Sequence, residues 1–356
     1  MKGRTRFQWR HVAVALMAAS LVGATAVPSI AARPHRAPTA YTQYKPVKGP
    51  YTIGYDIYYD ANSWSQELAL DFKYAVSLHK KLIKHVYYTS SNGSSVTQVQ
   101  NLQDLITKHV NLIIVSPISP TGIEPVIAQA RRDGIAVVVM ATPAAGKQYS
   151  AFVNVNDFAF GKVGAQWLAN KLHGKGNIIV LNGLAGYATS EERWAGAESV
   201  FKHYPGIKVV GSAYAGWAFA PAKAAVANLL AAHPVINGVW SQGGAMTAGA
   251  VAAFQAAHRP LVPMTGEDYN GFLKVWAKLK PKGFDSIAPA KPTWLATRAL
   301  DVGLAILEGK RVLKNQFYHV PVITSKTVNK YVRWNLPNDV FDNTNLPVSW
   351  LKKFFG

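Results

Sequence analysis

Short, continuous runs of apolar residues recur along the chain, and each is followed by a stretch in which apolar residues return every three or four positions. A continuous run predicts a strand that is buried on both faces, and the longer spacing predicts an amphipathic helix. Ser119 followed by Pro120 predicts the start of one such helix. The expected strands are residues 51–55, 86–88, 112–115, 135–139, 152–155, 178–181, 209–211, 238–240, 261–264, 286–288 and 320–324. Strands that alternate with helices predict right-handed βαβ units and parallel sheets.

The alternating pattern starts again near residue 152, so we expect two similar α/β lobes. Pro289 and Pro292 then isolate a last long helix, residues 293–307, before an irregular tail. The predicted fold is two doubly wound parallel-sheet lobes joined by a hinge, with a ligand cleft between them. The expected boundaries are 51–150 with 290–317 for the N-terminal lobe, and 151–289 with 318–356 for the C-terminal lobe. The expected crossings between the lobes are residues 141–156, 288–292 and 317–320.

One predicted strand, residues 178–181, leads through a glycine-bearing loop into a helix. Thr189 and Glu192 fit a capping box that would start this helix, with Thr189 as the N-cap. Gly196 is small, so we expect the helix to lie close to the sheet. Ligands of open parallel sheets bind beyond the carboxyl ends of the strands, which makes Arg193 in the first turns a candidate ligand-binding residue. The alternative is a solvated surface arginine.

The beginning of the chain has the pattern of an export signal. Four basic residues precede residue 11, and residues 11–27 are mostly small and apolar. This pattern predicts a secretory signal peptide over residues 1–32, because the apolar core is too short and too rich in alanine for a membrane anchor. Residues 33–50, rich in proline and polar residues, predict a flexible lead-in. We therefore expect a periplasmic or extracellular protein.

The composition narrows the function classes. With 356 residues, of which 49% are hydrophobic and 16% charged, the chain suits two globular domains with buried sheets. It has no cysteine, which excludes disulfides, thiolate metal sites, cysteine nucleophiles and a lipidated N-terminal cysteine. The net charge is +20, but the basic residues are scattered, so we do not expect nucleic acid as a partner. Motifs for dinucleotides, nucleotide phosphates, serine hydrolysis or zinc are missing, and we expect neither a catalytic site nor a metal or other cofactor.

The order of the segments between residues 51 and 324 resembles the type I periplasmic sugar-binding proteins of ABC transporters, the ribose and galactose group. The stretches that carry this resemblance are residues 101–117, 189–196, 228–242 and 266–268. The chain departs from the family pattern at Ala141-Thr142, at Gly243-Gly244 and at Pro289. These departures leave fewer polar groups to reach the ligand, so they do not indicate which sugar binds. Residues 62–64 together with residues 266–271 indicate a divergent branch of the family.

The resemblance implies a site in which a sugar lies between aromatic faces while charged side chains bind its hydroxyl groups. Carried over to this chain, the aromatic positions are Trp64 and Trp217, and the charged positions are Arg193 and Asp268. Both tryptophans also fit a place in the core or at a hinge. The other implied ligand-binding residues are Asn62, Thr142, Gln242, Glu267 and Asn270. The last two also fit a role in capping the helix that follows them.

The resemblance further implies the function. We expect a solute-binding protein and not an enzyme. It is expected to capture a monosaccharide and to deliver it to an ABC permease in the membrane. It is expected to act as a monomer. The alternative is a sensor subunit that presents the sugar to a membrane receptor or kinase. A transcriptional regulator is disfavoured by the predicted signal peptide, and a secreted hydrolase by the lack of an identifiable carboxylate pair.

Overall fold

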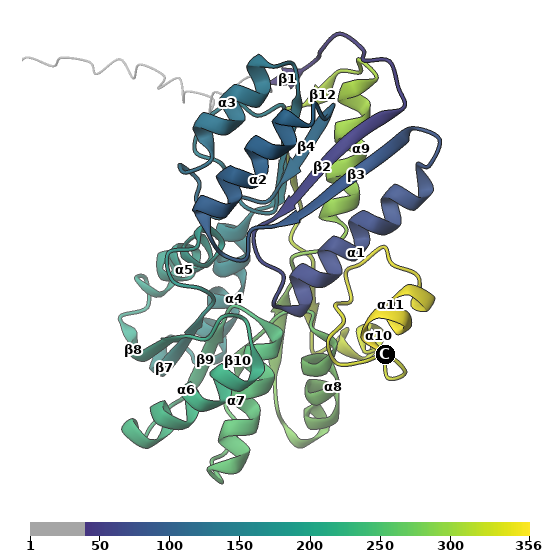
Figure 1. Cartoon of the computed structure of the whole chain (residues 1–356). Helices are drawn as coiled ribbons and strands as arrows, with labels where there is room; N and C mark the ends of the chain where they lie inside the picture. Colours follow the sequence, from purple (N-terminus) through teal and green to yellow (C-terminus); the bar gives the residue numbers. More distant parts are fainter. Residues whose placement is uncertain (1–39) are drawn as a thin grey trace, which may run out of the picture. The chain divides into compact units, whose positions relative to one another are not determined.

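The computed structural model describes residues 40–356, and the predicted signal peptide and the lead-in up to residue 39 lie outside the described residues. The described part contains two six-stranded sheets with helices on their faces (Figure 1). We call the sheet that holds β2 (Tyr51–Ile57), together with its helices, the N-terminal lobe, and the sheet that holds β7 (Lys175–Asn182), together with its helices, the C-terminal lobe. The prediction of two α/β lobes built on parallel sheets is confirmed.

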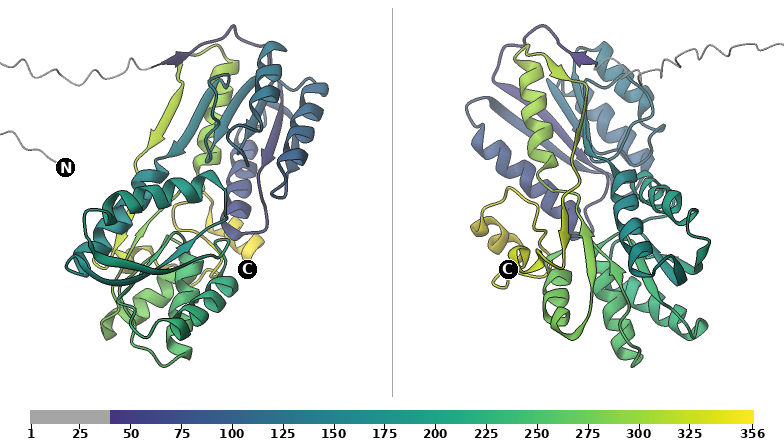
Figure 2. Two further views of the ribbon diagram at one scale, coloured as in Figure 1. Left: turned by 90° about the vertical axis from the view of Figure 1, so that its left-hand side faces the viewer. Right: turned by 180° about the vertical axis from the view of Figure 1, so that it is seen from behind.

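In the N-terminal lobe all neighbouring strands are parallel. In pairing order they are β13 (Asn315–Tyr318), β6 (Ala151–Val155), β5 (Ala136–Met140), β4 (Leu112–Val115), β2 and β3 (Ile83–Ser90). The helices of this lobe are α1 (Ser63–Leu78), α2 (Ser95–Thr107), α3 (Glu124–Arg132) and α9 (Leu295–Leu307). Helices α1 and α9 cover one face of the sheet, as the views in Figure 2 show for α9, and α2 and α3 cover the other.

The C-terminal lobe has the same plan, with one antiparallel pair at its edge, between β11 (Ser286–Pro289) and β14 (Val322–Thr324). In pairing order the strands are β14, β11, β10 (Met264–Thr265), β9 (Gly238–Ser241), β7 and β8 (Gly206–Tyr214). The helices are α4 (Asp157–Lys171), α5 (Ala188–Phe201), α6 (Phe219–Ala232), α7 (Gly244–Ala256), α8 (Asn270–Leu279) and the 3-10 turn η1 (Lys280–Lys282). The remaining elements are β1 (Tyr41–Thr42), β12 (Val312–Leu313), α10 (Val328–Tyr331) and α11 (Val348–Phe355).

Strands covered on both faces explain the continuous apolar runs in the sequence. In β4, Leu112 and Ile114 belong to the core under α1 and α9, whereas Ile113 and Val115 belong to the core under α2 and α3. Successive side chains of a strand point to opposite faces, so every position of such a strand needs an apolar residue. The central strands were therefore predictable from the continuous runs of apolar residues in the sequence.

The chain passes between the two sheets three times. It leaves the N-terminal sheet after β6, returns to that lobe between β11 and α9, and leaves again between β13 and β14. These passages fall in or directly beside the three expected crossings. The boundary itself differs from the prediction, because β6 was expected to open the C-terminal lobe but pairs with β5 and β13 in the N-terminal sheet. The pairing partner of β6 comes from residues far along the chain, and local sequence does not reveal it.

Both ends of the described chain are more ordered than expected. The prediction of a flexible lead-in is wrong for residues 40–50, because β1 pairs with β12 and the hydroxyl of Thr42 donates to the carbonyl oxygen of Ser150 at 2.7 Å. The tail after β14 was expected to be irregular and to belong to the C-terminal lobe. It forms α10 and α11 and contacts both lobes, because Val328 and Val332 pack in the core of the C-terminal lobe while Leu346 and Leu351 pack with Leu70 of α1 in the N-terminal lobe.

The predicted capping box of α5 is also wrong. The helix begins at Ala188 with Tyr187 in the N-cap position, and no side chain caps it. Thr189 is buried, and its hydroxyl lies 3.4 Å from the ammonium group of Lys291. Gly196 faces α4 rather than the sheet, since a Cβ atom there would lie 2.0 Å from the carbonyl oxygen of Phe158. A polar side chain at a helix start caps the helix only when it is free of tertiary partners.

A second predicted helix start is wrong as well. Ser119 and Pro120 lie in a turn, and α3 begins at Glu124 with Ile123 in the N-cap position. The hydroxyl of Ser119 accepts a hydrogen bond from the backbone amide of Gly122 at 3.2 Å. Serine favours such turns for the same reason that it favours caps, because its short side chain reaches nearby backbone amides.

Candidate functional site

A pocket lies between the two lobes, and the residues around it follow the carboxyl ends of strands. Tyr58 follows β2, Ala141 follows β5, Gly243 follows β9 and Glu267 follows β10. This is the edge at which open parallel sheets bind their ligands. The lining residues are Tyr58, Asn62, Ser63, Trp64, Ala141 and Thr142 from the N-terminal lobe, Tyr187, Thr189, Arg193, Trp217, Gly243, Gly244, Ala245 and Glu267 from the C-terminal lobe, and Lys291 and Phe341 from connecting segments.

Two tryptophans supply large apolar surfaces to this pocket. Trp64 lies in the first turn of α1, and its indole nitrogen donates to the backbone oxygen of Lys291 at 2.7 Å. Trp217 lies between β8 and α6, and its indole nitrogen is buried without a hydrogen-bond partner. Both rings also pack against the cores of the two lobes. Each tryptophan therefore lies at the pocket and at the junction of the lobes at the same time.

The position of Trp217 depends on two glycines. A Cβ atom on Gly183 would lie 2.1 Å from the indole ring, and one on Gly243 would lie 2.7 Å from it. Trp217 itself has a φ of 55°, a left-handed conformation that is unfavourable for a bulky residue. The loops after β7 and β9 thus form a slot that accepts this ring, and the ring is held at the pocket in spite of a strained backbone.

Tyr187 connects the lobes across the pocket. Its hydroxyl lies 2.7 Å from the hydroxyl of Thr142, and its ring stacks on Tyr58 with 4.8 Å between the centroids. The edge of the same ring meets Trp217 at 5.8 Å. Tyr187 precedes α5 in the C-terminal lobe, whereas Thr142 and Tyr58 belong to the N-terminal lobe. The contacts of Tyr187 with Thr142 and Tyr58 therefore exist only when the lobes are together.

Beneath the rings lies a buried network of charged side chains around Arg193. Its Nε atom donates to Asp157 and one terminal nitrogen donates to Glu267, each at 3.1 Å. The other terminal nitrogen donates to the backbone oxygen of Gln242 at 2.7 Å. The guanidinium group also lies 3.7 Å from the centroid of the Phe160 ring. Arg193 is therefore a buried, fully oriented cation, and the solvated alternative does not hold.

Lys291 completes this network from the crossing between β11 and α9. Its ammonium group donates to the second oxygen of Asp157 at 2.7 Å and to the backbone oxygen of Ala141. Burial lowers the pKa of Lys291, while the nearby Asp157 opposes that change. Burial raises the pKa of Glu267 to about 7, and Arg193 opposes the rise. Two cations and two carboxylates thus face one another, and their charges balance when all four are ionised.

Six of the nine predicted ligand-binding residues line the pocket. They are Asn62, Trp64, Thr142, Arg193, Trp217 and Glu267. The side-chain oxygen of Asn62 also caps α1 by accepting from the amide of Ser65 at 2.8 Å. Gln242 lies behind Arg193, and its side-chain amide donates to Asn182 and to the backbone oxygen of Ser190. The structure therefore brings most of the expected set together around one space.

Asp268 and Asn270 are not among the residues that line the pocket, and both contact the C-terminal tail. One carboxylate oxygen of Asp268 accepts hydrogen bonds from the backbone and side-chain nitrogens of Asn343, at 2.8 and 2.7 Å. The amide nitrogen of Asn270 donates to the backbone oxygens of Arg333 and Pro337, and its oxygen accepts from the backbone amide of Arg333. Both side chains hold the tail against the start of α8.

Among the lining residues that sequence reasoning missed, four have large side chains. Tyr58 and Tyr187 form the aromatic stack, Lys291 supplies the second cation, and Phe341 comes from the tail. Lys291 had a local signal, because a lysine among prolines in an otherwise apolar crossing is unusual. Tyr58 and Tyr187 also lie beyond the carboxyl ends of strands, after β2 and β7, whereas Phe341 reaches the pocket from the distant tail, which no spacing in the sequence indicates.

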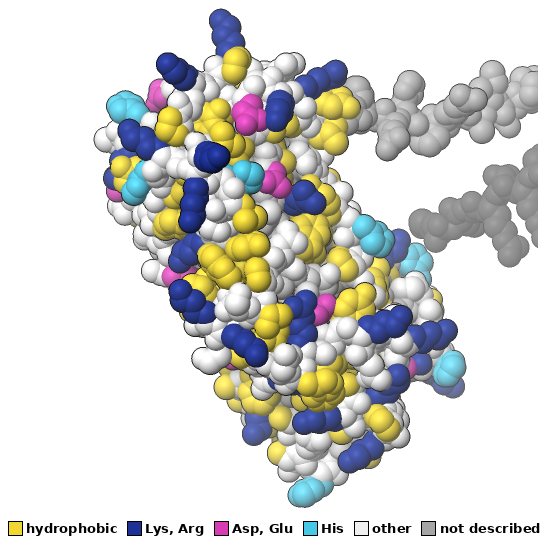
Figure 3. Space-filling view, turned by 90° about the vertical axis from the view of Figure 1, so that its right-hand side faces the viewer, with side chains coloured by type: hydrophobic (Ala, Val, Ile, Leu, Met, Phe, Trp, Pro, Cys, Tyr) yellow, Lys and Arg dark blue, Asp and Glu magenta, His cyan; other side chains and the backbone are white. Residues whose placement is uncertain are grey.

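The described residues show no features of a metal centre or membrane span. Within residues 40–356, no three His, Asp or Glu side chains are grouped so as to hold a metal ion. In the same part of the chain, no helix is both long and apolar enough to cross a membrane. On the face shown in Figure 3, Lys and Arg side chains are spread among apolar and neutral ones and form no continuous basic patch. The pocket is thus the feature that best indicates function.

Comparisons with known proteins agree with this geometry. Residues 53–311 match the family described as periplasmic binding protein domain. The xylitol-binding protein of Mycolicibacterium smegmatis is 30% identical over 243 residues, which are 68% of this chain and 69% of that protein. Among solved structures, an ABC transporter solute binding protein from Thermobispora bispora has a TM-score of 0.75 at 22% identity, covering 86% of this chain and 94% of that one. The fructose binding periplasmic domain of a hybrid two component system has a TM-score of 0.69 at 23% identity, covering 79% and 92%. The chain therefore belongs to the periplasmic binding protein family, as a divergent member of its type I sugar-binding group.

Proposed function

We propose that this protein is an extracytoplasmic solute-binding protein that captures a small neutral sugar or sugar alcohol between its lobes. The observation that carries the proposal is the pocket itself, where Trp64 and Trp217 offer apolar faces beside the oriented polar groups of Arg193 and Glu267. A sugar has apolar C–H faces and a rim of hydroxyl groups, and aromatic rings with charged hydrogen-bonding groups complement both.

The charge balance of the pocket supports a neutral ligand. Asp157 and Glu267 pair with Arg193 and Lys291, so an added carboxylate or ammonium group would have no free partner of opposite charge among them. Burying an unpaired charge is costly, whereas hydroxyl groups need only hydrogen bonds. The name of the xylitol-binding relative supports the same class of ligand. We propose a monosaccharide or a polyol of similar size.

Six residues are proposed to contact this ligand directly: Asn62, Trp64, Thr142, Arg193, Trp217 and Glu267. Gln242 is proposed to support them from behind by fixing Arg193 through its backbone oxygen. Asp268 and Asn270 are proposed to act at a distance, through the tail that they hold. The unpartnered indole nitrogen of Trp217 is a hydrogen-bond donor available to a ligand hydroxyl group.

A thermal-shift screen tests the proposal, because a compound that binds only the folded state raises the melting temperature. The panel contains xylitol, D-ribose, D-fructose, D-allose and L-arabinose, each next to a charged counterpart such as the sugar acid or amino sugar. We expect at least one neutral compound to raise the melting temperature, and titration calorimetry to give a one-to-one stoichiometry. A protein that responded only to charged compounds, or to none, would contradict the proposal.

We further propose that the protein is exported by its N-terminal signal, acts as a monomer without enzymatic activity, and delivers its ligand to an ABC permease. Deleting the gene in its host should then abolish uptake of the labelled ligand at low concentration. The second candidate is a sensor subunit, since the same fold occurs in a fructose binding domain of a two component system. Normal uptake together with a lost transcriptional response to the ligand would favour that candidate.

A further inference from the structure

We infer that the C-terminal segment of residues 341–345 is part of the binding site, with Phe341 as one wall of the pocket and with Glu67 and Asp268 as the residues that position it. The inference rests on the proposed function and adds a site residue that neither the sequence motifs nor the family match includes. The family match ends at residue 311 and does not include this segment.

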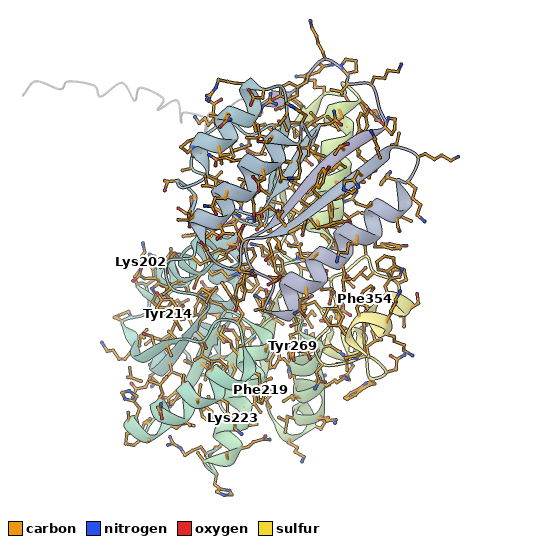
Figure 4. The ribbon with its side chains drawn as sticks, in the orientation of Figure 1. Lys202, Tyr214, Phe219, Lys223, Tyr269 and Phe354 are labelled. Carbon is orange, nitrogen blue, oxygen red and sulfur yellow. The ribbon has the colours of Figure 1, made fainter. Side chains whose placement is uncertain are left out.

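Phe341 is placed by pairing with a strand-like stretch of the C-terminal lobe. It forms an isolated antiparallel bridge with Tyr269, and the two rings meet with 5.7 Å between their centroids. Tyr269 is labelled in Figure 4, at the start of α8. Only 4% of Phe341 is exposed, and the pocket between the lobes is the one described cavity that this residue lines.

Next to Phe341, the segment is bonded to the C-terminal lobe through Asp268. The backbone amide of Asp342 donates to the backbone oxygen of Asp268 at 3.2 Å. The carboxylate of Asp268 accepts from both nitrogens of Asn343. These bonds fix the backbone directly after the ring, and they explain why an aspartate at this position is fully buried.

The opposite side of the segment is bonded to α1 of the N-terminal lobe. The backbone amide of Phe341 donates to the carboxylate of Glu67 at 2.8 Å. One turn along the helix, Asp71 accepts from the hydroxyl of Thr344 at 2.8 Å and from the backbone amide of Asn345 at 3.2 Å. Glu67 and Asp71 lie four residues apart, so both carboxylates point from the same side of α1.

The segment is also bonded to the crossing between the lobes. The backbone amide of Thr293 donates to the backbone oxygen of Asn343 at 3.0 Å, and its hydroxyl donates to Asp71 at 2.6 Å. The tail thus connects the two lobes a fourth time, after the three covalent crossings. When the lobes separate, contacts on one side of it must break, and Phe341 then loses part of what holds it at the pocket.

The hydrogen bonds of the segment to Glu67 and Asp268 go beyond what is needed to pack the tail on α1. The apolar contacts of Leu336, Val340, Leu346 and Leu351 with Leu70 already hold the tail on α1. Buried carboxylates such as Glu67 and Asp268 contribute little net stability, because desolvation offsets what their hydrogen bonds gain, but they fix the geometry of their partners. Here the group that Glu67 fixes is the backbone amide of Phe341, a residue that lines the pocket.

Titration calorimetry with xylitol, D-ribose and D-fructose on the full chain tests the inference. Phe341→Ala removes the wall and is expected to weaken binding by about tenfold or more, and Phe341→Leu, which keeps the apolar volume and loses the flat face, by about threefold or more. Val340→Ala is the matched control, because Val340 is fully buried one residue away but packs on α1 outside the pocket. It should lower the melting temperature and leave the affinity within about twofold.

Glu67 is tested as a positioning residue. Glu67→Ala leaves the amide of Phe341 without its acceptor and should weaken binding, whereas Glu67→Gln keeps a carbonyl oxygen there and should restore most of the affinity. Phe341→Leu and Phe341→Ala variants that fold and bind within about twofold of the wild type would overturn the inference. If Phe341→Ala does not fold, Phe341→Leu decides alone. If the wild type binds none of the three, the same titrations use the compound of the thermal-shift panel that raises its melting temperature. Only a protein that bound no compound of that panel would contradict the proposed function, whereas normal binding by both Phe341 variants contradicts this inference alone.

Discussion

The hydroxyl groups of Tyr187 and Thr142 lie 2.7 Å apart and form a hydrogen bond from one lobe to the other above the pocket. Both side chains are buried, and within residues 40–356 the only other hydrogen-bond partner of the Thr142 hydroxyl is the hydroxyl of Ser116, at 3.5 Å. The bond therefore stabilises the arrangement in which the lobes are together. A ligand that binds between the lobes benefits from every interaction that favours this arrangement.

Tyr187→Phe should weaken ligand binding without unfolding the protein. The change removes the bond to Thr142 and keeps the stack on Tyr58, and a buried unmade hydrogen bond costs about 1 kcal/mol, or roughly fivefold in affinity. Calorimetry measures the affinity, and X-ray scattering measures the radius of gyration with and without ligand. Tyr204→Phe is the matched control, because it removes a tyrosine hydroxyl that accepts from Gln166 within the C-terminal lobe, at a residue that does not line the pocket. An unchanged affinity in Tyr187→Phe would show that the bond does not favour the closed arrangement.

Gly183→Ala should disturb the pocket through Trp217. The new methyl group would lie 2.1 Å from the indole ring, so the ring must move. We expect a loss of about 1–3 kcal/mol in the free energy of unfolding and a loss of affinity of about tenfold. Gly164→Ala in α4 is the control, because a methyl group there makes contacts of 3.4 Å or longer. Chemical denaturation and calorimetry on both variants check the prediction, which fails if the two behave alike.

Lys291→Met should destabilise the protein strongly. It keeps the length of the side chain but leaves one oxygen of the buried Asp157 without its cation, and breaking a buried ion pair costs about 3–5 kcal/mol. Asp157→Asn combined with Lys291→Met should cost less than Lys291→Met alone, because no unpaired charge then remains. Lys310→Met removes the exposed pair with Glu308 and should cost less than about 1 kcal/mol. Equal losses for the two lysines, measured by urea denaturation, would contradict the buried role of Lys291.

Acid should stabilise this protein over part of the pH range. Burial raises the pKa of Glu67 to about 8 and that of Asp71 and Asp268 to about 6. Since their pKa values are higher in the folded than in the unfolded chain, the folded protein binds more protons, and its stability falls as the pH rises through these values. The free energy of unfolding should therefore be larger at about pH 5 than at about pH 8.5.

Glu67→Gln separates the contribution of this one carboxyl group to the pH dependence. Glutamine does not titrate, so the variant should show a smaller difference in the free energy of unfolding between the two pH values than the wild type. Glu198→Gln, at an exposed position on α5, should leave the difference unchanged. Urea denaturation at both pH values provides the measurement. A wild type that is more stable at the higher pH would contradict the prediction.

Much of the fold follows from the sequence because its cause is local. A strand such as β4 lies between two layers of helices, so each of its positions is apolar and the run is visible without a structure. Trp64 was predictable as a pocket residue for a related reason, since it follows a strand end at the start of a helix. In an open parallel sheet the ligand-binding side chains lie beyond the carboxyl ends of the strands, so their positions follow from the strands themselves.

The tertiary structure decided what lies at those places. Asp268 was predicted to bind a ligand hydroxyl group, but it is not among the residues that line the pocket, and one of its carboxylate oxygens accepts hydrogen bonds from Asn343 of the tail. Phe341 lines the pocket because the tail returns to pair with Tyr269, and nothing in its local sequence indicates this. A side chain at a strand end has the same local sequence whether it meets a ligand or another part of the chain, and long-range packing alone determines which partner it finds.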